Sequence, residues 1–159
     1  MDGLEGRKVL VTGATGLVGR RVVSRLREAG FDIRIASRLP QRPAGADDAV
    51  ALPGADAPRE AFLALMLDVT HVVHCAALNN DRSAGAADFR TVNATLTGRL
   101  AHAAAARTDG RFIHLSSIRA VVGAGFSGTI DEATPPAPQC AYGRSKGEGE
   151  IAMLEAFAT

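Results

Sequence analysis

The sequence predicts an α/β domain built on a doubly wound parallel sheet. Short β-branched and aliphatic runs alternate with helical patterns at intervals of roughly 20–40 residues, which is typical of βαβ units. A glycine-rich turn joins the first such run to the first helical pattern. The chain has 159 residues, a length that suits one domain better than two.

The first half of the chain carries three of the expected strands. Residues 8–12 (KVLVT) are β-branched and lack a helical period, so they predict a buried strand. Apolar residues at a spacing of four then predict a helix over residues 20–29, which Gly30 ends. We expect a second strand at residues 32–37 and a short third strand at residues 49–52. Residues 39–49 between them are rich in Pro and Gly and predict a loop.

The second half carries two more strands and the longer helices. Helical patterns cover residues 59–67, 87–107 and 142–157, whereas residues 123–138 are irregular. Strands are expected at residues 71–75 (HVVHC) and 111–115 (RFIHL). In open parallel sheets ligands bind beyond the carboxyl ends of the strands. The site is therefore expected just after Thr12, Ser37, Cys75 and Leu115.

Charge and composition exclude several classes of protein. The 18 basic and 17 acidic side chains leave a net charge of +1, which argues against a nucleic-acid or anionic-membrane partner. We expect no signal peptide and no membrane span, because no apolar run is long enough. Cys75 and Cys140 allow one disulfide at most, so reduced thiols in the cytoplasm are expected. No Cys and His cluster has metal-binding spacing, so we predict no metal.

The turn after the first strand predicts a dinucleotide site. Residues 12–19 read TGATGLVG, which places Gly13, Gly16 and Gly19 three residues apart. Such glycines let the backbone turn tightly and approach a pyrophosphate, whose charge is held by free N–H groups at a helix N-terminus. The alternative is a turn with a purely structural role, since the chain contains 17 glycines.

The residues after the second strand bear on the choice of dinucleotide. Domains that prefer NAD usually carry Asp or Glu there to bind the ribose 2′-hydroxyl. This chain has Ser37 and Arg38 instead. A guanidinium pairs with phosphate in bidentate geometry, so the pattern favours NADP over NAD. The alternative is a solvated loop arginine, since Arg accounts for 16 of the 18 basic residues.

One pair of residues points to acid/base chemistry. The single tyrosine, Tyr142, lies four residues before Lys146, which is one of only two lysines. Residues four apart share a helical face. A free phenol has a pKa near 10 and is a poor base at neutral pH, but a nearby ammonium favours the phenolate. The alternative is an ordinary surface tyrosine beside a surface lysine.

Hydroxyl and imidazole side chains also lie near the expected edge. Ser116 and Ser117 follow the fifth strand, where a hydroxyl can orient a substrate oxygen, although a serine pair also ends strands by binding local backbone. His74 and His114 each come near the end of a strand and are interpreted as strand residues rather than ligands.

Several motifs occur in a fixed order along almost the whole chain. They are TGATGLVG, HVVHCAA, Asn93 in the long helix, FIHLSSI and YGRSK. This set resembles the extended short-chain dehydrogenase/reductase family, in particular its NAD-dependent epimerase/dehydratase branch, which acts on nucleotide sugars. The resemblance implies a Rossmann-type fold and a homodimer built from the long helix and the last helix.

The resemblance also implies a role for each matching residue. Tyr142 would be the catalytic acid/base and Lys146 its electrostatic and ribose-binding partner. Ser117 would orient the substrate, with Ser116 as the alternative, and Asn93 would help to order the site. The implied cofactor-binding residues are Gly13, Thr15, Gly16, Leu17, Gly19, Ser37, Arg38, Ala76, Ala77, Asn93, Tyr142 and Lys146.

The chain departs from the family pattern in two places. Val122 and Gly123 stand where the family often has Tyr-Gly. Family members also continue with further strands and a small substrate lobe. We therefore expect residues 1–159 to form a dinucleotide-binding domain without the C-terminal strands and that lobe.

The expected function is NAD(P)-dependent hydride and proton transfer at a secondary alcohol of a nucleotide sugar, as in an epimerase or dehydrogenase. One alternative is a hydroxysteroid dehydrogenase or carbonyl reductase on the same scaffold. Another is a non-catalytic dinucleotide-binding module or a truncated product.

Overall fold

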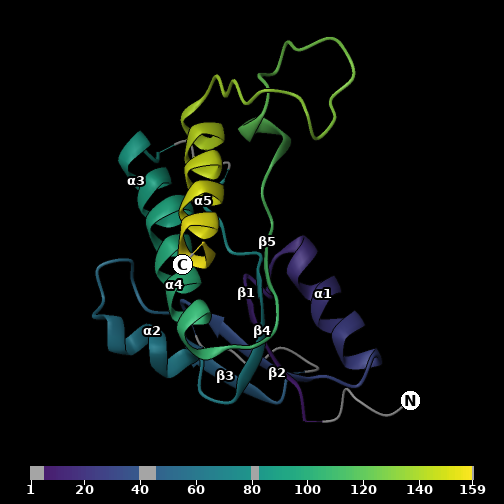
Figure 1. Cartoon of the computed structure of the whole chain (residues 1–159), viewed down its shortest axis with the longest axis vertical. Helices are drawn as coiled ribbons and strands as arrows, with labels where there is room; N and C mark the ends of the chain where they lie inside the picture. The colour runs from purple at the N-terminus through teal and green to yellow at the C-terminus, as the bar shows by residue number, and fades with distance from the viewer. Residues whose placement is uncertain (1–5, 40–45, 80–82, 159) are drawn as a thin grey trace.

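The computed structural model describes residues 6–39, 46–79 and 83–158, so residues 40–45 of the expected loop lie outside the described residues (Figure 1). Five strands form one parallel sheet in the order β3-β2-β1-β4-β5. This order confirms the predicted doubly wound α/β fold. The strands are β1 (Lys8–Thr12), β2 (Asp32–Ser37), β3 (Asp48–Ala51), β4 (Val69–His74) and β5 (Phe112–His114).

The central strands are buried on both faces. Val9, Leu10 and Val11 of β1 are each 1% exposed or less, which explains their unbroken apolar run. The outer strands are shorter and less buried, and Ile113 of β5 is exposed. The third strand starts and ends one residue earlier than predicted, and the fourth starts two residues earlier.

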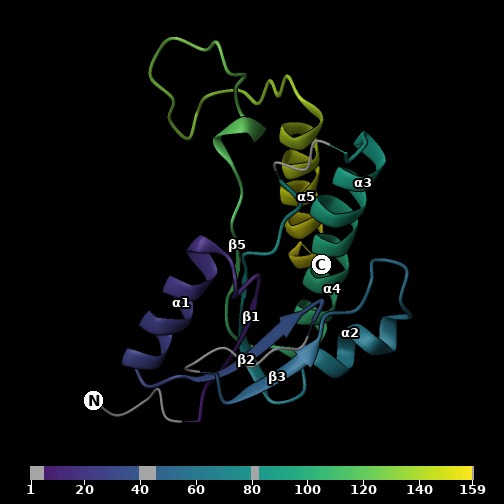
Figure 2. The same cartoon turned by 180° about the vertical axis from the view of Figure 1, so that it is seen from behind.

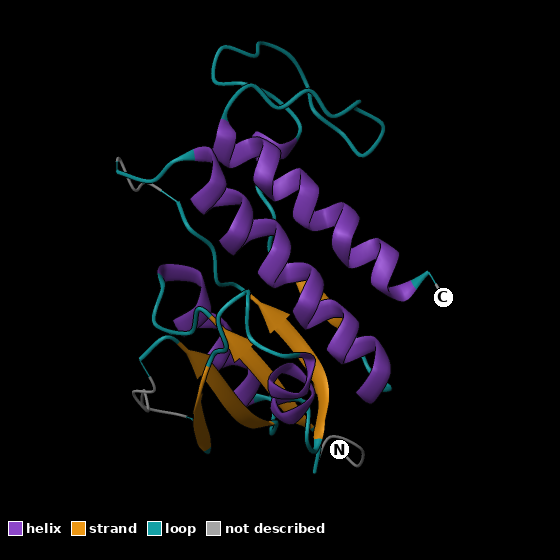
Figure 3. Cartoon of the chain, turned by 90° about the vertical axis from the view of Figure 1, so that its left-hand side faces the viewer, coloured by secondary structure: helices purple, strands orange, loops and turns teal. Residues whose placement is uncertain are grey.

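Helices cover the two faces of the sheet unequally (Figures 1 and 2). On one face, Val23 of α1 (Leu17–Glu28) packs against Val11 and Ile35. On the other face, α2 (Arg59–Leu65) and α4 (Leu96–Arg107) supply Phe62 and Leu100 to a second cluster. Helix α5 (Ala141–Phe157) lies beside α4 rather than directly on the sheet (Figure 3).

The long helix is not the uninterrupted α-helix that the sequence predicts over residues 87–107. Helix α3 (Ala86–Arg90) passes into a π-helical turn, η1 (Thr91–Thr95), before α4 begins. The wider turn accompanies a buried asparagine, Asn93, whose amide makes hydrogen bonds outside the helix. Alanine-rich composition predicts helix but carries no signal for this local widening.

The carboxyl edge of the sheet carries the longest irregular segment. After β5 the chain forms a short 3₁₀ turn, η2 (Ile118–Ala120), which the sequence did not predict. Residues 121–140 then project beyond the edge without regular structure before α5 begins (Figure 1). The predicted irregular stretch at residues 123–138 is thus confirmed.

Candidate active site

The candidate site lies where β1 and β4 end side by side. The register pairs Thr12 with both Ala36 and His74, and His74 with His114, so four strand ends meet at one edge. From β1 the chain crosses toward β2, and from β4 it crosses toward β5 in the opposite direction. This reversal is the topological switch point at which open α/β sheets bind ligands.

The glycine-rich turn is shaped for close backbone approach. Gly13 has a φ of +67°, and a Cβ atom there would lie 2.6 Å from the backbone nitrogen of Ala76. A Cβ atom on Gly19 would collide with the carbonyl oxygen of Gly13. A side chain at Gly13 would therefore push the turn away from the segment after β4, and one at Gly19 would push α1 away from the turn.

The start of α1 presents the backbone N–H groups of its first turn. Gly16 precedes the helix, no side chain caps it, and no acidic residue lies in the first turn. Thr15 and Leu17 are exposed beside this end of the helix. Such an end carries partial positive charge and suits an anion.

The turn is tied to the segment that follows β4. The backbone N–H of Ala76 donates to Thr12 Oγ1 at 3.2 Å, and that of Cys75 donates to the Thr12 carbonyl at 3.2 Å. Ala77, the next residue, is exposed. The structure thus brings the two segments that the sequence assigned to the dinucleotide into direct contact.

Ser37 and Arg38, the two residues at the end of β2 that were predicted to bind the dinucleotide, differ in their contacts. The Ser37 hydroxyl donates to the Leu39 carbonyl, whereas the Arg38 side chain is exposed. Their position one strand away from β1, at the carboxyl edge, agrees with the predicted placement.

Asn93 links three parts of the site from the π-helical turn. Its Oδ1 accepts from the Leu78 N–H at 2.8 Å, and its Nδ2 donates to the Leu78 carbonyl at 2.9 Å. Nδ2 also lies 3.0 Å from Ser145 Oγ, which donates to the Tyr142 carbonyl. Asn93 therefore joins the segment after β4 to the first turns of α5.

Tyr142 and Lys146 lie one turn apart near the start of α5. The helix begins after Cys140, whose Sγ accepts from the Gly143 N–H at 3.3 Å. The ring of Tyr142 is half-buried and meets Phe89 of α3 edge to face, with centroids 6.1 Å apart. The Tyr142 ring therefore lies on the side of α5 that faces α3.

Lys146 is the most deeply buried charged residue that the structure describes, at 1% exposed. Its Nζ donates to the Leu115 carbonyl at 2.7 Å and lies 3.3 Å from His114 Nε2. Burial lowers the pKa of Lys146 to about 8, with Glu150 and Cys75 opposing the shift. The ammonium is thus held at the end of β5, at the predicted edge.

The serine pair is not joined to the phenol by any hydrogen bond among the described residues. Ser117 is half-buried and caps the 3₁₀ turn η2 by accepting from the Arg119 N–H at 3.3 Å, whereas Ser116 is exposed. Both lie at the end of β5, as predicted, and their ranking stays a prediction.

Sequence reasoning missed three polar residues that support the site. Ser145 and Thr97 are buried hydrogen-bonding partners, and His114 contacts Lys146. Ser145 carried one available signal, since a serine three residues after the tyrosine faces the same side of the helix. His74 and His114 lie in strands, as interpreted, but they are also hydrogen-bonded neighbours of the site.

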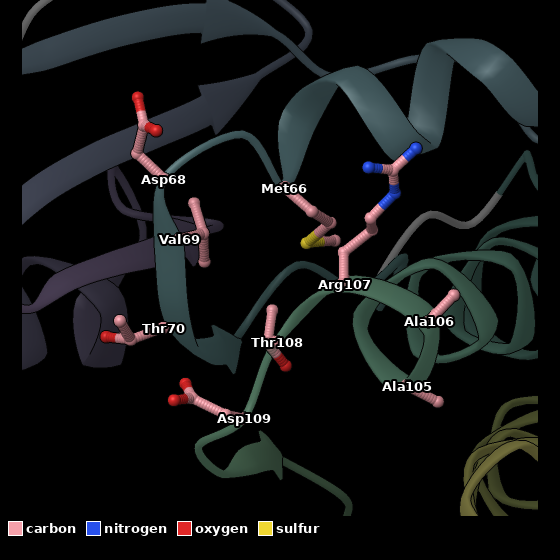
Figure 4. Close-up of a pocket in the computed structure, with 9 residues that line it drawn as sticks. All are labelled: Met66, Asp68, Val69, Thr70, Ala105, Ala106, Arg107, Thr108 and Asp109. Atoms are coloured by element: carbon pink, nitrogen blue, oxygen red, sulfur yellow. The ribbon is translucent and has the colours of Figure 1, made fainter.

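One cavity lies away from this edge (Figure 4). It has a volume of about 560 Å³ and is lined by the start of β4 and the end of α4, including Asp68, Arg107 and Asp109. Strand starts and helix ends gather at the amino edge of a parallel sheet, opposite the expected ligand site.

The described residues contain neither a candidate metal-binding group nor a helix that could span a membrane. Among these residues no three His, Cys, Asp or Glu side chains come together in a group able to hold a metal. No helix in the described part of the chain has both the length and the apolar character needed to cross a membrane. Cys75 and Cys140 are free thiols.

Comparison with known proteins assigns the family. The sequence model of the NAD dependent epimerase/dehydratase family matches residues 9–159. The chain therefore belongs to this family, within the branch that its motifs resemble. A search of curated proteins gives no match.

Solved structures share the fold over nearly the whole chain. MoeE5 in complex with UDP-glucuronic acid and NAD is 27% identical, with a TM-score of 0.81 over 96% of this chain and 50% of its own. UDP-N-acetylglucosamine 4-epimerase from Bacillus cereus is 28% identical, with a TM-score of 0.77 over 94% of this chain and 54% of its own.

A short-chain dehydrogenase/reductase superfamily protein from Agrobacterium tumefaciens with bound NAD is 29% identical, with a TM-score of 0.76 over 92% of this chain and 44% of its own. The chain thus spans about half the length of these solved structures.

Proposed function

We propose that this chain forms the dinucleotide-binding part of an NAD(P)-dependent epimerase or dehydrogenase that acts at a secondary alcohol of a nucleotide sugar. The observation that carries the proposal is the buried Lys146 at the carboxyl edge of the sheet, one helical turn after the only tyrosine. Similarity to MoeE5, crystallised with a UDP sugar and NAD, supports the substrate class.

The residues present fit a dinucleotide. The turn at Gly13 and Gly19 leaves backbone where a Cβ atom would intrude, and the uncapped N-terminus of α1 suits a pyrophosphate. The cofactor would be held by Gly13, Thr15, Gly16, Leu17, Gly19, Ser37, Arg38, Ala76, Ala77, Asn93, Tyr142 and Lys146. When bound, a nicotinamide cofactor accepts and returns hydride.

The protein's own groups would move and orient the proton. The Tyr142 hydroxyl would exchange a proton with the substrate alcohol, because a phenol can act as both acid and base when a cation stabilises its anionic form. Lys146 would supply that cation. Ser117, with Ser116 as the alternative, would donate to the substrate oxygen and hold it toward the phenol.

Tyr142→Phe tests the catalytic assignment. The variant removes the exchangeable proton but keeps the ring that packs on Phe89. We expect turnover of UDP-glucose or UDP-glucuronic acid, followed by reduced-nicotinamide absorbance and sugar analysis, to fall at least about 100-fold while dinucleotide affinity changes little. Phe89→Leu is the matched packing control. Turnover in Tyr142→Phe close to that of the wild-type chain would reject the assignment.

Titration with each dinucleotide tests the cofactor preference. We propose NADP as the preferred dinucleotide on the strength of Arg38, with NAD as the alternative that the bound ligands of MoeE5 and the Agrobacterium tumefaciens protein favour. Arg38→Ala should then weaken NADP binding about tenfold and leave NAD binding unchanged. Wild-type affinity for NAD equal to or tighter than that for NADP would overturn the preference.

The same assays separate the other candidate functions. Tight dinucleotide binding with no turnover of any alcohol or sugar would favour a non-catalytic binding module. Turnover of a steroid or simple ketone in preference to a UDP sugar would favour the hydroxysteroid dehydrogenase or carbonyl reductase alternative.

We also propose a homodimer through α4 and α5 and a cytoplasmic location. Ile151, Leu154 and Phe157 are large apolar residues exposed on α5, and a groove of about 410 Å³ runs between α4 and α5. Exposed apolar groups on adjacent helices favour a protein partner. The free thiols of Cys75 and Cys140 support a reducing compartment.

A further inference from the structure

Three basic side chains lie in a row where β4 and β5 end: the buried His74 and Lys146, with the half-buried His114 between them. His74 and His114 face each other across the two strands, with stacked rings whose centroids are 5.3 Å apart and whose planes differ by 21°. Lys146 Nζ lies 3.3 Å from His114 Nε2. His74 is 0% exposed and Lys146 is 1% exposed.

The hydrogen-bond partners fix the tautomer of His74. Thr97 Oγ1 donates its only proton to the Asn93 carbonyl at 2.8 Å, so it must accept from His74 Nε2, 3.0 Å away. His74 Nδ1 therefore carries no proton and accepts from the Thr12 hydroxyl at 2.6 Å. Burial lowers the pKa of His74 to about 3, so this ring is neutral at physiological pH.

The same reasoning sets the proton on His114. A lysine ammonium only donates, so His114 Nε2 accepts from Lys146 and the ring proton lies on Nδ1. Among the described residues, His114 Nδ1 is the buried side-chain polar atom without a hydrogen-bond partner. Burial, with the charge of Lys146 adding to it, lowers the pKa of His114 to about 4, so it too is neutral.

We propose that His114 is a positioning residue for Lys146. Its neutral ring, held flat against His74, accepts from the ammonium through Nε2 and fixes Nζ at the end of β5. Together with the Leu115 carbonyl it engages two of the three ammonium donors. The third donor is then left for a ligand at the carboxyl edge. Because His114 Nε2 accepts from Lys146, the ring proton must lie on Nδ1, where no partner is found among the described residues.

The inference deepens the proposed function, because it rests on Lys146 as the partner of Tyr142. Several groups face the ammonium and must be considered together. His74 and Cys75 approach from the end of β4, His114 from β5, and Glu150 from one turn further along α5. Only His114 combines an acceptor atom near Nζ with a tautomer that the neighbouring groups determine.

The first measurement uses the unaltered chain. Long-range ¹H–¹⁵N correlation spectra report the tautomer of each of the four histidines. We expect His114 to carry its proton on Nδ1 and His74 to carry its proton on Nε2 at neutral pH. A His114 ring protonated on Nε2 would overturn the proposal without any variant.

The second measurement follows Lys146 itself. With ¹³C-labelled lysine the chain gives signals from only two side chains, Lys8 and Lys146, and the Cε shift reports the charge on Nζ. Removing a neutral acceptor destabilises the ammonium, so the pKa of Lys146 should fall by about one unit in His114→Phe. His114→Gln places an oxygen near the position of Nε2 and should restore most of that shift.

The control variant is His71→Phe, which changes a half-buried histidine of the same sheet that bonds Thr70 instead of Lys146. It should leave the Lys146 titration unchanged. An unshifted pKa of Lys146 in a folded His114→Phe chain, or equal shifts in the Phe and Gln variants, would overturn the proposal. Neither measurement needs cofactor or substrate, so failure here is distinct from failure of the Tyr142→Phe test.

Discussion

At the scale of single residues, Lys146 couples the site to stability. The side chain has an ordinary pKa of 10.5 when solvated, and burial lowers that pKa to about 8 in the folded chain. Between these two values the unfolded chain binds more protons than the folded chain. Lys146 therefore contributes a rise in the free energy of unfolding as the pH rises from 8 to 10.5, because the cost of burying its charge disappears.

Lys146→Met should remove this dependence. Methionine keeps an unbranched chain without the charge, so the variant should be more stable than the wild-type chain at pH 7. The stability difference should shrink by about 3 kcal/mol between pH 8 and pH 10.5. Urea unfolding at several pH values measures the difference, and Lys8→Met, at a half-buried residue, is the control. A difference that does not change over this pH range would contradict the expectation.

At the scale of elements, the π-helical turn joins the long helix to α5. The turn η1 brings Asn93 inward so that its amide bonds both backbone groups of Leu78 and the hydroxyl of Ser145. These hydrogen bonds join the helix to other parts of the chain, whereas the backbone bonds of a regular α-helix stay within it. The widened turn therefore fixes the start of α5, and with it Tyr142, relative to the segment after β4.

Asn93→Ala should destabilise the fold and loosen that segment. The change leaves the half-buried backbone groups of Leu78 and the buried hydroxyl of Ser145 without this partner, which should lower the free energy of unfolding by about 3 kcal/mol. Thr95→Ala, at an exposed position in the same turn, should cost far less. Urea unfolding and hydrogen exchange at the Leu78 amide measure the two effects. Unchanged protection of that amide in Asn93→Ala would show that the link is not formed.

At the scale of the whole molecule, α5 leaves large apolar side chains uncovered. Ile151, Leu154 and Phe157 of α5 are 58%, 63% and 43% exposed. A helix with a polar outer face would bury little apolar area on association, whereas these side chains would bury more. The proposed homodimer through α4 and α5 would cover them.

Leu154→Asp should convert a dimer to a monomer. A buried unpaired carboxylate at a helix–helix interface is strongly unfavourable, so the dimer should weaken by at least about 100-fold. Light scattering coupled to size exclusion measures the mass over a range of concentrations. Leu39→Asp changes another exposed leucine, one that follows β2, and should leave the mass unchanged. A wild-type chain that is monomeric at every concentration would reject the proposed dimer.

Much of the architecture could be predicted from local patterns. Every predicted strand and helix is present, because β-branched runs such as residues 8–12 and the period of the α1 residues reflect short-range preferences. The ends moved by one to three residues, since the sheet register decides where pairing stops. The π-helical turn was missed, because the hydrogen bonds that accompany it join Asn93 to Leu78, fifteen residues back in the chain.

The sequence by itself determined the class of fold, the glycine turn between β1 and α1, and the pairing of Tyr142 with Lys146 on one helix. Each of these depends on residues close together in the chain, so spacing alone defines it. Only the tertiary structure decided what surrounds Lys146. Its contacts with His114 and Leu115 join residues more than thirty positions apart. Such contacts exist only once the parallel strands align their ends at one edge of the sheet.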